Sequence, residues 1–211
     1  MASPARTSVY LASRSPRRRE LLKQIGVTFE VLVLREKPGR GPDVDESQLE
    51  GELPGDYVRR VCRAKADVGW DRVLQRRLRR FPVLAADTVV CIDEEILGKP
   101  TDPADAARML RLLSGREHRV LTAVALRLDE QADLAVSESR VRFCALSDSD
   151  IETYVATGEP GDKAGAYAIQ GRAAAFVTEL RGSYSGVMGL PLHETAQLLK
   201  KFQTALASPL P

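Results

Sequence analysis

The sequence predicts an α/β protein with a mixed central β-sheet flanked by helices, and three observations support this. Candidate strands and helices alternate along the chain, but without the strict repeat that a doubly wound parallel sheet requires. Residues 83–92 are almost continuously apolar, which is typical of a central strand buried on both faces. Residues 120–128 and 135–146 form two long strand candidates in succession. A mixed sheet is therefore expected rather than an all-parallel one.

The first predicted elements are a strand, a helix and a second strand. Residues 9–12 are a short apolar strand candidate. Ser15 is a good N-cap and Pro16 suits the first helical position, so a helix should begin there. Gly26 can end this helix, because glycine readily adopts the left-handed conformation found after many helices. Residues 27–34 predict the second strand.

Residues 35–55 are rich in Gly, Pro and acidic side chains and predict a long surface loop. A loop of that length in a compact protein is usually functional or disordered. Asp56 is expected to cap the next helix, whose apolar face includes Val61. The basic stretch 75–80 follows that helix.

The second half of the chain continues with short elements separated by turns. A turn is expected at residues 98–100, and Asp102 with the proline after it should begin a helix that stops near Gly115. Asp148 is expected to cap a short helix over 151–155. The other predicted elements are a Gly-rich loop and strand at 158–171, a strand at 174–180 and a last helix at 192–202.

Length and composition indicate one domain or two small ones, with enough chain to bury a sizeable core. The hydrophobic fraction of 44% and the charged fraction of 28% are those of an ordinary soluble protein. The formal net charge of +2 is too small to argue for nucleic acid or a membrane as a partner. The basic run 76–80 has no interleaved aromatic residues, so it is interpreted as a solvated helix face.

The cysteines and the N-terminus bear on the compartment. Cys62, Cys91 and Cys144 are widely spaced and include no CxxC pair, so buried free thiols in a reducing compartment are expected. The first residues contain no apolar run of signal-peptide length, and no segment approaches a transmembrane span. A cytoplasmic location is therefore expected.

Asp87 is the residue that most suggests chemistry. It interrupts the apolar run 83–92, where burying an unpaired carboxylate would be costly. It is either a functional carboxylate or an Asp that caps a turn or pairs with a buried Arg. The local pattern leaves both interpretations open.

Basic side chains gather at positions where phosphate could bind. Arginines crowd the helix start after Ser13, and a bound anion would relieve their conflict with the positive end of the helix dipole. A solvated Arg-rich face is the alternative. Lys65, Lys99 and Lys163 would each be ordinary surface lysines taken singly. Together with Asp87, they would supply cations for phosphate oxygens and a carboxylate for a divalent ion.

Several other chemistries are excluded by the motifs. With only His118 and His193 in the chain, a His-rich zinc site is not expected, and the HExxH pattern that begins at His193 fails at Gln197. The sequence contains no GxxxxGK[ST] loop, no GxGxxG after a strand and no GxSxG elbow. Residues 182–186 predict a flexible turn, and Ser183 is not expected to be a nucleophile.

Six short blocks occur in order along nearly the whole chain. They are LASRSPRR at 11–18, ADT at 86–88, GKP at 98–100, SG at 114–115 with His118 and Thr122, EPGDKAGAYAIQG at 159–171, and GSY with GLPL between 182 and 192. This series closely resembles the Maf family. The ordered set is far more specific than any single block.

The resemblance implies a single domain over residues 7–204 with a C-terminal tail at 205–211. It also implies an inosine-triphosphate-pyrophosphatase-like fold with a cleft between two lobes. The implied activity is hydrolysis of nucleoside triphosphates to the monophosphate and pyrophosphate, helped by Mg²⁺ or Mn²⁺. By motif, Asp87 would be the general base and a metal ligand. The residues that would surround the triphosphate are Ser13, Arg18, Lys65, Lys99 and Lys163.

The same resemblance suggests a branch of the family. Arg17, Thr88 and Gln170 match the specificity-setting positions and look like the branch that acts on dTTP and UTP. In a related branch of the family, which acts on 7-methyl-GTP, the resemblance places Trp, Gln and Glu at or near those positions. The neutral amide of Gln170 can donate to and accept from a pyrimidine edge, whereas a carboxylate would suit a cationic methylated purine.

Two departures and two alternatives accompany this interpretation. The acidic cluster that the family shows after its second strand is matched only poorly, by Glu36, and residues 185–188 differ from the usual late block. The alternatives are a related pyrophosphatase for a modified purine such as 7-methyl-GTP, and a nucleotide-binding regulator of septum formation. Whether the chain forms a homodimer stays open.

Overall fold

The computed structural model describes residues 8–34 and 42–207. Its strands are β1 (Ser8–Leu11), β2 (Thr28–Val31), β3 (Val83–Ile92), β4 (Glu95–Leu97), β5 (Glu117–Leu128), β6 (Gln131–Phe143) and β7 (Val177–Arg181). They form one sheet in the order β2-β1-β3-β5-β6-β7, with β4 also paired to β3. β1 runs parallel to β2 and β3, whereas all other pairs are antiparallel. The predicted mixed sheet is confirmed.

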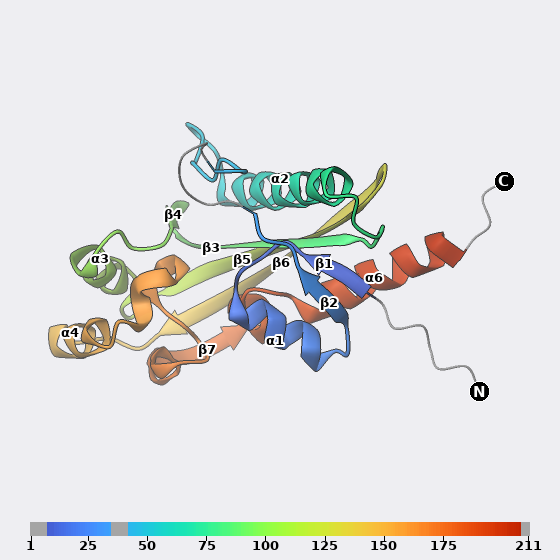
Figure 1. Ribbon diagram of the computed structural model, residues 1–211. Helices are drawn as coiled ribbons and strands as arrows, with labels where there is room; N and C mark the ends of the chain where they lie inside the picture. Colours follow the sequence, from blue (N-terminus) through green and yellow to red (C-terminus); the bar gives the residue numbers. More distant parts are fainter. Residues whose placement is uncertain (1–7, 35–41, 208–211) are drawn as a thin grey trace.

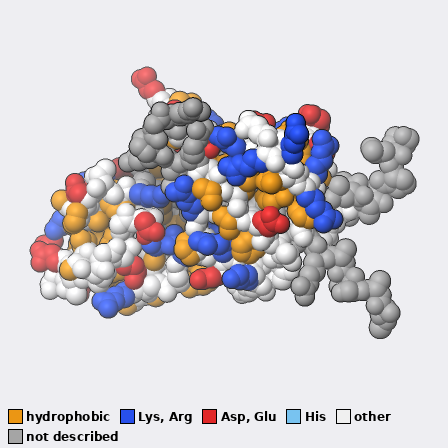
Figure 2. All heavy atoms as spheres, viewed as in Figure 1, with side chains coloured by type: hydrophobic (Ala, Val, Ile, Leu, Met, Phe, Trp, Pro, Cys, Tyr) orange, Lys and Arg blue, Asp and Glu red, His pale blue; other side chains and the backbone are white. Residues whose placement is uncertain are grey.

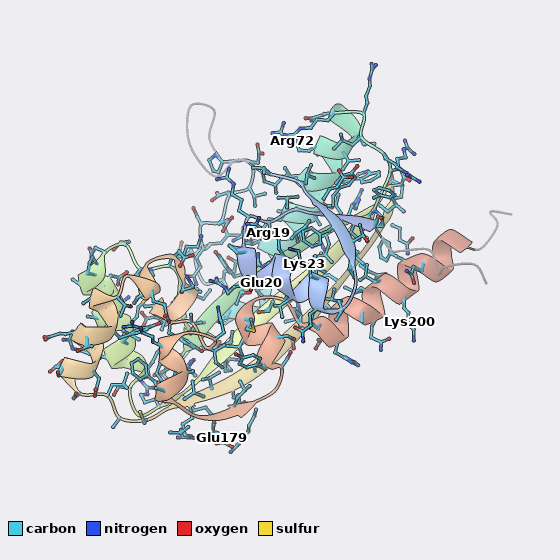
Figure 3. The ribbon with its side chains drawn as sticks, turned by 60° about the horizontal axis from the view of Figure 1, so that its bottom comes forward. Arg19, Glu20, Lys23, Arg72, Glu179 and Lys200 are labelled. Atoms are coloured by element: carbon cyan, nitrogen blue, oxygen red, sulfur yellow. The ribbon has the colours of Figure 1, made fainter. Side chains whose placement is uncertain are left out.

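Helices cover both faces of the sheet. They are α1 (Pro16–Gln24), α2 (Pro54–Gln75), α3 (Pro103–Leu113), α4 (Asp148–Ala156), α5 (Tyr184–Met188) and α6 (Leu192–Ala207). Figure 1 shows α2 along one face, α1 and α6 along the other, and α3 and α4 at one end. Figure 3 labels Arg19, Glu20 and Lys23 on α1 and Arg72 on α2. None of the helices in these described ranges has the length and apolar character needed to cross a bilayer.

The buried apolar side chains form two clusters, one in each half of the molecule. The first includes Leu11, Trp70 and Phe202 and packs α2 and α6 against the sheet. The second includes Leu110 and Ile151 and packs α3 and α4 against the far ends of the long strands. Because β3, β5 and β6 contribute to both clusters, the long strands join the two lobes, and a cleft lies between them.

Most predicted elements are present, with shifted ends. The helix at Pro16 has Ser15 as its cap, as expected. Asp56 does not cap α2; Leu53 occupies the N-cap and Pro54 the first turn, so Asp56 lies inside the helix. Asp148 likewise does not cap α4, because Ser147 forms a reciprocal capping box with the aspartate three residues on. In both cases the cap lies N-terminal to the predicted residue.

The Gly-rich regions differ most from prediction. The prediction of a strand within 158–171 is wrong. The segment instead forms 3₁₀ turns at Glu159–Asp162 and Ala164–Ala166, with Gly165 at a φ of 69°. The flexible turn expected around Ser183 is instead the start of α5, and the Ser183 side chain caps it by accepting from the amide N–H of Gly186. The short strand β4 was not predicted.

Candidate active site

A gap in the sheet opens a large cavity. β1 pairs with β3 only at Val83 and Leu84, and β4 pairs with it only from Val90 onward. In the described part of the chain, no strand therefore covers residues 85–89 of β3 on that edge. A cavity of about 1110 Å³ opens there. Since successive side chains of a strand point to opposite faces, an open edge gives the cavity access to both faces of β3.

The cavity brings together every residue that the sequence marked for the site. These line it: Ser13, Arg17, Arg18, Lys65, Asp87, Thr88, Lys99, Lys163 and Gln170. They come from the β1–α1 connection, the first turn of α1, α2, β3, the loop after β4 and the segment around the 3₁₀ turns. Figure 2 shows Lys and Arg side chains across the middle of this face, over the region where α1 lies in Figure 1.

Asp87 is a buried carboxylate held by a lysine. Its residue is 7% exposed, and its Oδ1 accepts a hydrogen bond from Nζ of Lys65 at 2.7 Å. The same Nζ lies 3.0 Å from Oε1 of Glu46. The partner seen here is a lysine, where the second interpretation had a turn or a buried Arg; this lysine lies on the cavity wall, and a second carboxylate shares it.

Glu46 is the site residue that the sequence prediction missed. The candidate that was considered, Glu36, lies outside the described residues. The run Asp43-Val44-Asp45-Glu46 was a usable indication, because three acidic residues in four positions within a long loop are unusual for a segment without function. The run was overlooked because the acidic cluster was expected directly after the second strand, and residues 43–46 lie well beyond the end of β2.

Side chains of α2 hold the loop that carries Glu46. The Tyr57 hydroxyl donates to the backbone oxygen of Glu46 at 2.8 Å. Burial first, and then the charges of Asp87 and Glu46, raise the pKa of Tyr57 to about 12, so the hydroxyl keeps its proton. Arg60 donates to the backbone oxygen of Ser47 at 2.8 Å and to the Glu52 carboxylate. These contacts position Glu46 against Lys65.

The carboxylate pair suits a hard divalent cation. Among the described residues no group of three or more His, Cys, Asp and Glu side chains could hold a metal alone. Mg²⁺, however, usually takes one or two carboxylates and completes its shell with water and substrate phosphates. Asp87 and Glu46, both within 3.0 Å of one nitrogen, meet that requirement. The donor set therefore fits Mg²⁺ or Mn²⁺ bound together with a triphosphate.

Ser13 is placed to donate a hydrogen bond into the cavity. Its Oγ accepts from the backbone N–H of Ser15 and from Nη1 of Arg18, each at 3.2 Å. A hydroxyl has one hydrogen and two lone pairs, and both contacts use lone pairs. The hydrogen of Ser13 can therefore be donated to an oxyanion beside the N-terminus of α1.

Arg18 links the start of α1 to the end of α5. Its Nε donates to the backbone oxygen of Gly189 at 2.7 Å, and its Nη2 donates to Oγ1 of Thr88 at 3.3 Å. Burial lowers its pKa, while the nearby Asp87 carboxylate opposes that shift. Arginine remains protonated in proteins, so a partly buried positive charge lies at the cavity wall.

Three further cations face the same space. Burial lowers the pKa of Lys163, and the positive charges of Arg17 and Lys99 lower it further. Burial also lowers the pKa of Arg17. A cation whose proton affinity is lowered by neighbouring cations is stabilised by an anion bound beside it. This end of the cavity is therefore suited to the oxygens of a polyphosphate.

Gln170 and Thr88 also lie in the cavity lining. Gln170 is exposed and ends the segment that begins with the 3₁₀ turns. Tyr167 anchors that segment to β5, because its hydroxyl lies 2.9 Å from Nε2 of His118. Gly165, in the second 3₁₀ turn, anchors it as well, because its N–H donates to the backbone oxygen of Gly98 at 3.1 Å.

The cysteines do not supply a nucleophile to this cavity. Cys62 is buried beneath it and donates to the backbone oxygen of Ala85 at 3.6 Å. Burial, reinforced by the Asp87 charge, raises the pKa of the Cys62 thiol to about 12. A thiol with that pKa is inert at neutral pH, since the thiolate is the nucleophilic form.

Comparison with known proteins identifies close relatives. The family model described as "Maf-like protein" matches residues 8–202. The chain is 55% identical over 201 residues to the dTTP/UTP pyrophosphatase of Nitrosomonas europaea, covering 95% of this chain and 97% of the relative. It is 57% identical over 192 residues to the dTTP/UTP pyrophosphatase of Ralstonia nicotianae, covering 90% and 92%. Among solved structures, the Staphylococcus aureus Ham1 protein aligns at a TM-score of 0.48 and 13% identity, over 94% of this chain and 98% of that one.

Proposed function

Because this chain belongs to the Maf family, we propose that it hydrolyses dTTP and UTP to the nucleoside monophosphate and pyrophosphate. One observation carries the proposal most directly: a single cavity holds the buried carboxylate of Asp87, joined through Lys65 to the exposed carboxylate of Glu46, next to a group of cations. A triphosphate with a divalent ion requires both. Since both lobes line this cavity, residues 7–204 are proposed to work as one unit.

The triphosphate is proposed to lie along the cationic wall. Ser13 donates its hydroxyl hydrogen, and the N-terminus of α1 adds the positive end of its dipole. Charged donors that meet developing negative charge stabilise the transition state of phosphoryl transfer. The remaining phosphate-binding residues in this proposal are Arg18, Lys65, Lys99 and Lys163.

Asp87 is proposed to act as the general base. It takes a proton from a water molecule, whose oxygen forms a new bond to phosphorus as the bond to the bridging oxygen between the α- and β-phosphates breaks. The electron pair of that bond leaves with one of the two products, monophosphate or pyrophosphate. A positioned base contributes a factor of about 10²–10⁴ to the rate. Lys65, bonded to Oδ1 of Asp87, orients the carboxylate and leaves its second oxygen for the water.

Mg²⁺ or Mn²⁺ is proposed to bind at Asp87 and Glu46 together with the substrate. The ion would supply charge neutralisation for the triphosphate. Tyr57 and Arg60 contribute by holding the loop of Glu46 in reach. Glu46 is thereby proposed as a second metal ligand beside Asp87.

Arg17, Thr88 and Gln170 are proposed to select the base. The primary amide of Gln170 presents both a donor and an acceptor, which can match one edge of uracil or thymine. A modified purine such as 7-methylguanine carries a positive charge that this neutral amide does not offset. The proposed preference is therefore for the pyrimidines.

A cytoplasmic location is part of the proposal. It is supported by Cys62, Cys91 and Cys144, which are all free thiols. Thiols persist in reducing compartments, where nucleoside triphosphates are also abundant.

Product analysis tests the proposed reaction. Purified protein with dTTP and Mg²⁺ should yield dTMP and pyrophosphate in equal amounts, as measured by ³¹P NMR. Formation of dTDP and inorganic phosphate would show cleavage at the terminal linkage and would contradict the proposal.

A further inference from the structure

One pair of side chains holds the chain on both sides of Gln170. Tyr154 lies on α4, is 3% exposed, and donates its hydroxyl hydrogen to Oε1 of Glu159 at 2.8 Å. The same hydroxyl accepts a hydrogen bond from the backbone N–H of Ala168 at 3.2 Å. Oε2 of Glu159 accepts one from the backbone N–H of Arg172, also at 3.2 Å. The pair therefore fixes the backbone two residues before Gln170 and two residues after it.

Between these two contacts the chain makes a tight turn. The N–H of Gly171 donates to the backbone oxygen of Ala168 at 2.9 Å, so residues 168–171 form a four-residue turn with Gln170 at its third position. Ile169 is buried, whereas Gln170 is exposed and lines the cavity. The buried neighbour and the two bonded amides determine where this turn lies at the cavity.

A glycine permits the close approach of the carboxylate to this turn. A Cβ atom at position 171 would overlap the carboxylate of Glu159. Glycine has no Cβ and leaves that space free. The bond between Glu159 and Arg172 therefore depends on the absence of a side chain at Gly171.

The hydrogen-bond directions require an ionised acid and a protonated hydroxyl. A backbone N–H can only donate, so Glu159 must accept from Arg172 with one oxygen and from Tyr154 with the other. A carboxylate has acceptors on both oxygens, whereas an amide would have one acceptor and one donor. Burial first, and then the hydrogen bond to Glu159, raise the pKa of Tyr154 above its ordinary value of 10. The hydroxyl therefore keeps the hydrogen that it donates.

Lys163 lies on the same segment but is held differently. Its backbone N–H donates to the backbone oxygen of Pro160 at 3.0 Å, at the end of the first 3₁₀ turn. Burial first, and then the charge of Arg17, lower the pKa of Lys163, and the charge of Glu159 opposes this shift. An effect of Glu159 through charge must therefore be separated from an effect through the turn. Tyr154, whose hydroxyl is neutral, makes that separation possible.

We propose that Tyr154 and Glu159 are positioning residues that hold the turn of Gln170 and thereby set the preference for uracil and thymine. The inference rests on the proposed function, in which Gln170 contacts the base, and adds the residues that place it. Neither Tyr154 nor Glu159 is among the described residues that line the cavity. A misplacement of about 1 Å caused from outside a site can cost about a hundredfold in rate, so such residues can control recognition without contacting the substrate.

A double-mutant cycle tests this inference. Tyr154→Phe removes the shared hydroxyl without changing any charge, and Glu159→Gln replaces one of the two acceptors by a donor. Each should lower kcat/KM for UTP by about tenfold when Gln170 is present. In the Gln170→Ala background, each should change kcat/KM by less than about twofold, because the amide that they position is gone. An equal fold loss in both backgrounds would overturn the inference.

Base preference supplies a readout that a merely structural role would not change. In Tyr154→Phe, the ratio of kcat/KM for UTP to that for 7-methyl-GTP should fall, because only the pyrimidine depends on the placed amide. Equal losses on both nucleotides would mean a general structural defect and would also overturn the inference. Glu152→Gln is the matched control, since Glu152 is an exposed acid on α4 outside the cavity lining. It should keep the wild-type ratio.

The outcomes separate the inference from the proposed function. Failure of the wild-type protein to hydrolyse either UTP or dTTP overturns the proposed function, and the inference with it. Hydrolysis of UTP with no effect of Gln170→Ala overturns the inference alone, because the turn would then have no amide to place. Circular dichroism checks the fold of each variant. If Tyr154→Phe does not fold, Glu159→Gln, which keeps the side-chain shape at a partly exposed position, decides the cycle.

Discussion

Lys65 donates a hydrogen bond to the buried carboxylate of Asp87 at 2.7 Å, on the wall of the candidate active-site cavity. The same ammonium lies 3.0 Å from the carboxylate of Glu46, so one cation holds two acids from distant parts of the chain. Burying Asp87 on an apolar strand would be costly without such a partner. The pairing therefore explains how β3 carries a carboxylate and why that carboxylate faces the cavity.

Glu46→Gln should weaken the response to metal. If the ion binds at Asp87 and Glu46, losing one of two protein ligands should raise the Mg²⁺ concentration for half-maximal activity by at least about tenfold. Metal titrations of dTTP hydrolysis check this. Excess EDTA should abolish activity in the wild-type protein, and Mg²⁺ or Mn²⁺ should restore it. Glu50→Gln, in the same loop but outside the cavity lining, is the matched control. An equal Mg²⁺ requirement in both variants would remove Glu46 from the metal site.

Gln170→Glu should change base preference. The amide's N–H donor becomes a carboxylate oxygen, which would oppose a pyrimidine carbonyl as acceptor against acceptor. The expected loss in kcat/KM for dTTP and UTP is about ten- to a hundredfold. A cationic 7-methyl-GTP should lose less. Steady-state kinetics on the three nucleotides check this, and an unchanged preference ratio would place Gln170 outside base recognition.

His118 should make stability depend on pH on the acid side. It is 2% exposed, and burial lowers its pKa to about 4 from an ordinary value of 6.5. Between these values the unfolded chain binds the proton and the folded chain does not, so stability is lost as pH falls from 6.5 to about 4. The full shift corresponds to about 3 kcal/mol. Urea unfolding at pH 7 and pH 4.5 should show a smaller loss for His118→Gln than for the wild type. The same loss in both would mean that His118 is not the group responsible.

Gly165→Ala should destabilise the protein. Gly165 has a φ of 69°, and a Cβ atom there would lie 2.8 Å from Val90. Left-handed backbone and overpacking together should cost about 2–4 kcal/mol. Gly161→Ala is the control, since it has open space around it and no such φ. The test compares the free energies of unfolding of the two variants. Similar values would contradict the close contact between Gly165 and β3.

The sequence predicted those parts of the fold that depend on local pattern. Apolar runs predicted β3 and β5, and the Ser-Pro and Asp-Pro pairs predicted where α1 and α3 begin. Predictions failed where tertiary contacts override local preference. Residues 158–171 contain apolar side chains that resemble a strand. Two left-handed glycines, Gly158 and Gly165, turn the chain there instead.

The site was predictable in part for a related reason. Asp87 stood out because a carboxylate in a buried strand has an immediate energetic cost. Glu46 did not, because its nearness to Asp87 depends on how Tyr57 and Arg60 hold a loop against α2.

Pyrophosphate release by the wild type, Asp87→Asn and Asp67→Asn on dTTP and UTP tests the central claim most directly. Asp67 lies on α2 two positions beyond Lys65 and pairs with Arg127 away from the cavity, so its variant controls for loss of an acidic side chain. With all three proteins folded, the kcat of Asp87→Asn should be about 10²–10⁴-fold lower than that of the wild type on both nucleotides. Asp67→Asn should stay near the wild-type rate. Turnover by Asp87→Asn within a few-fold of the wild type would contradict the assignment of Asp87 as the base.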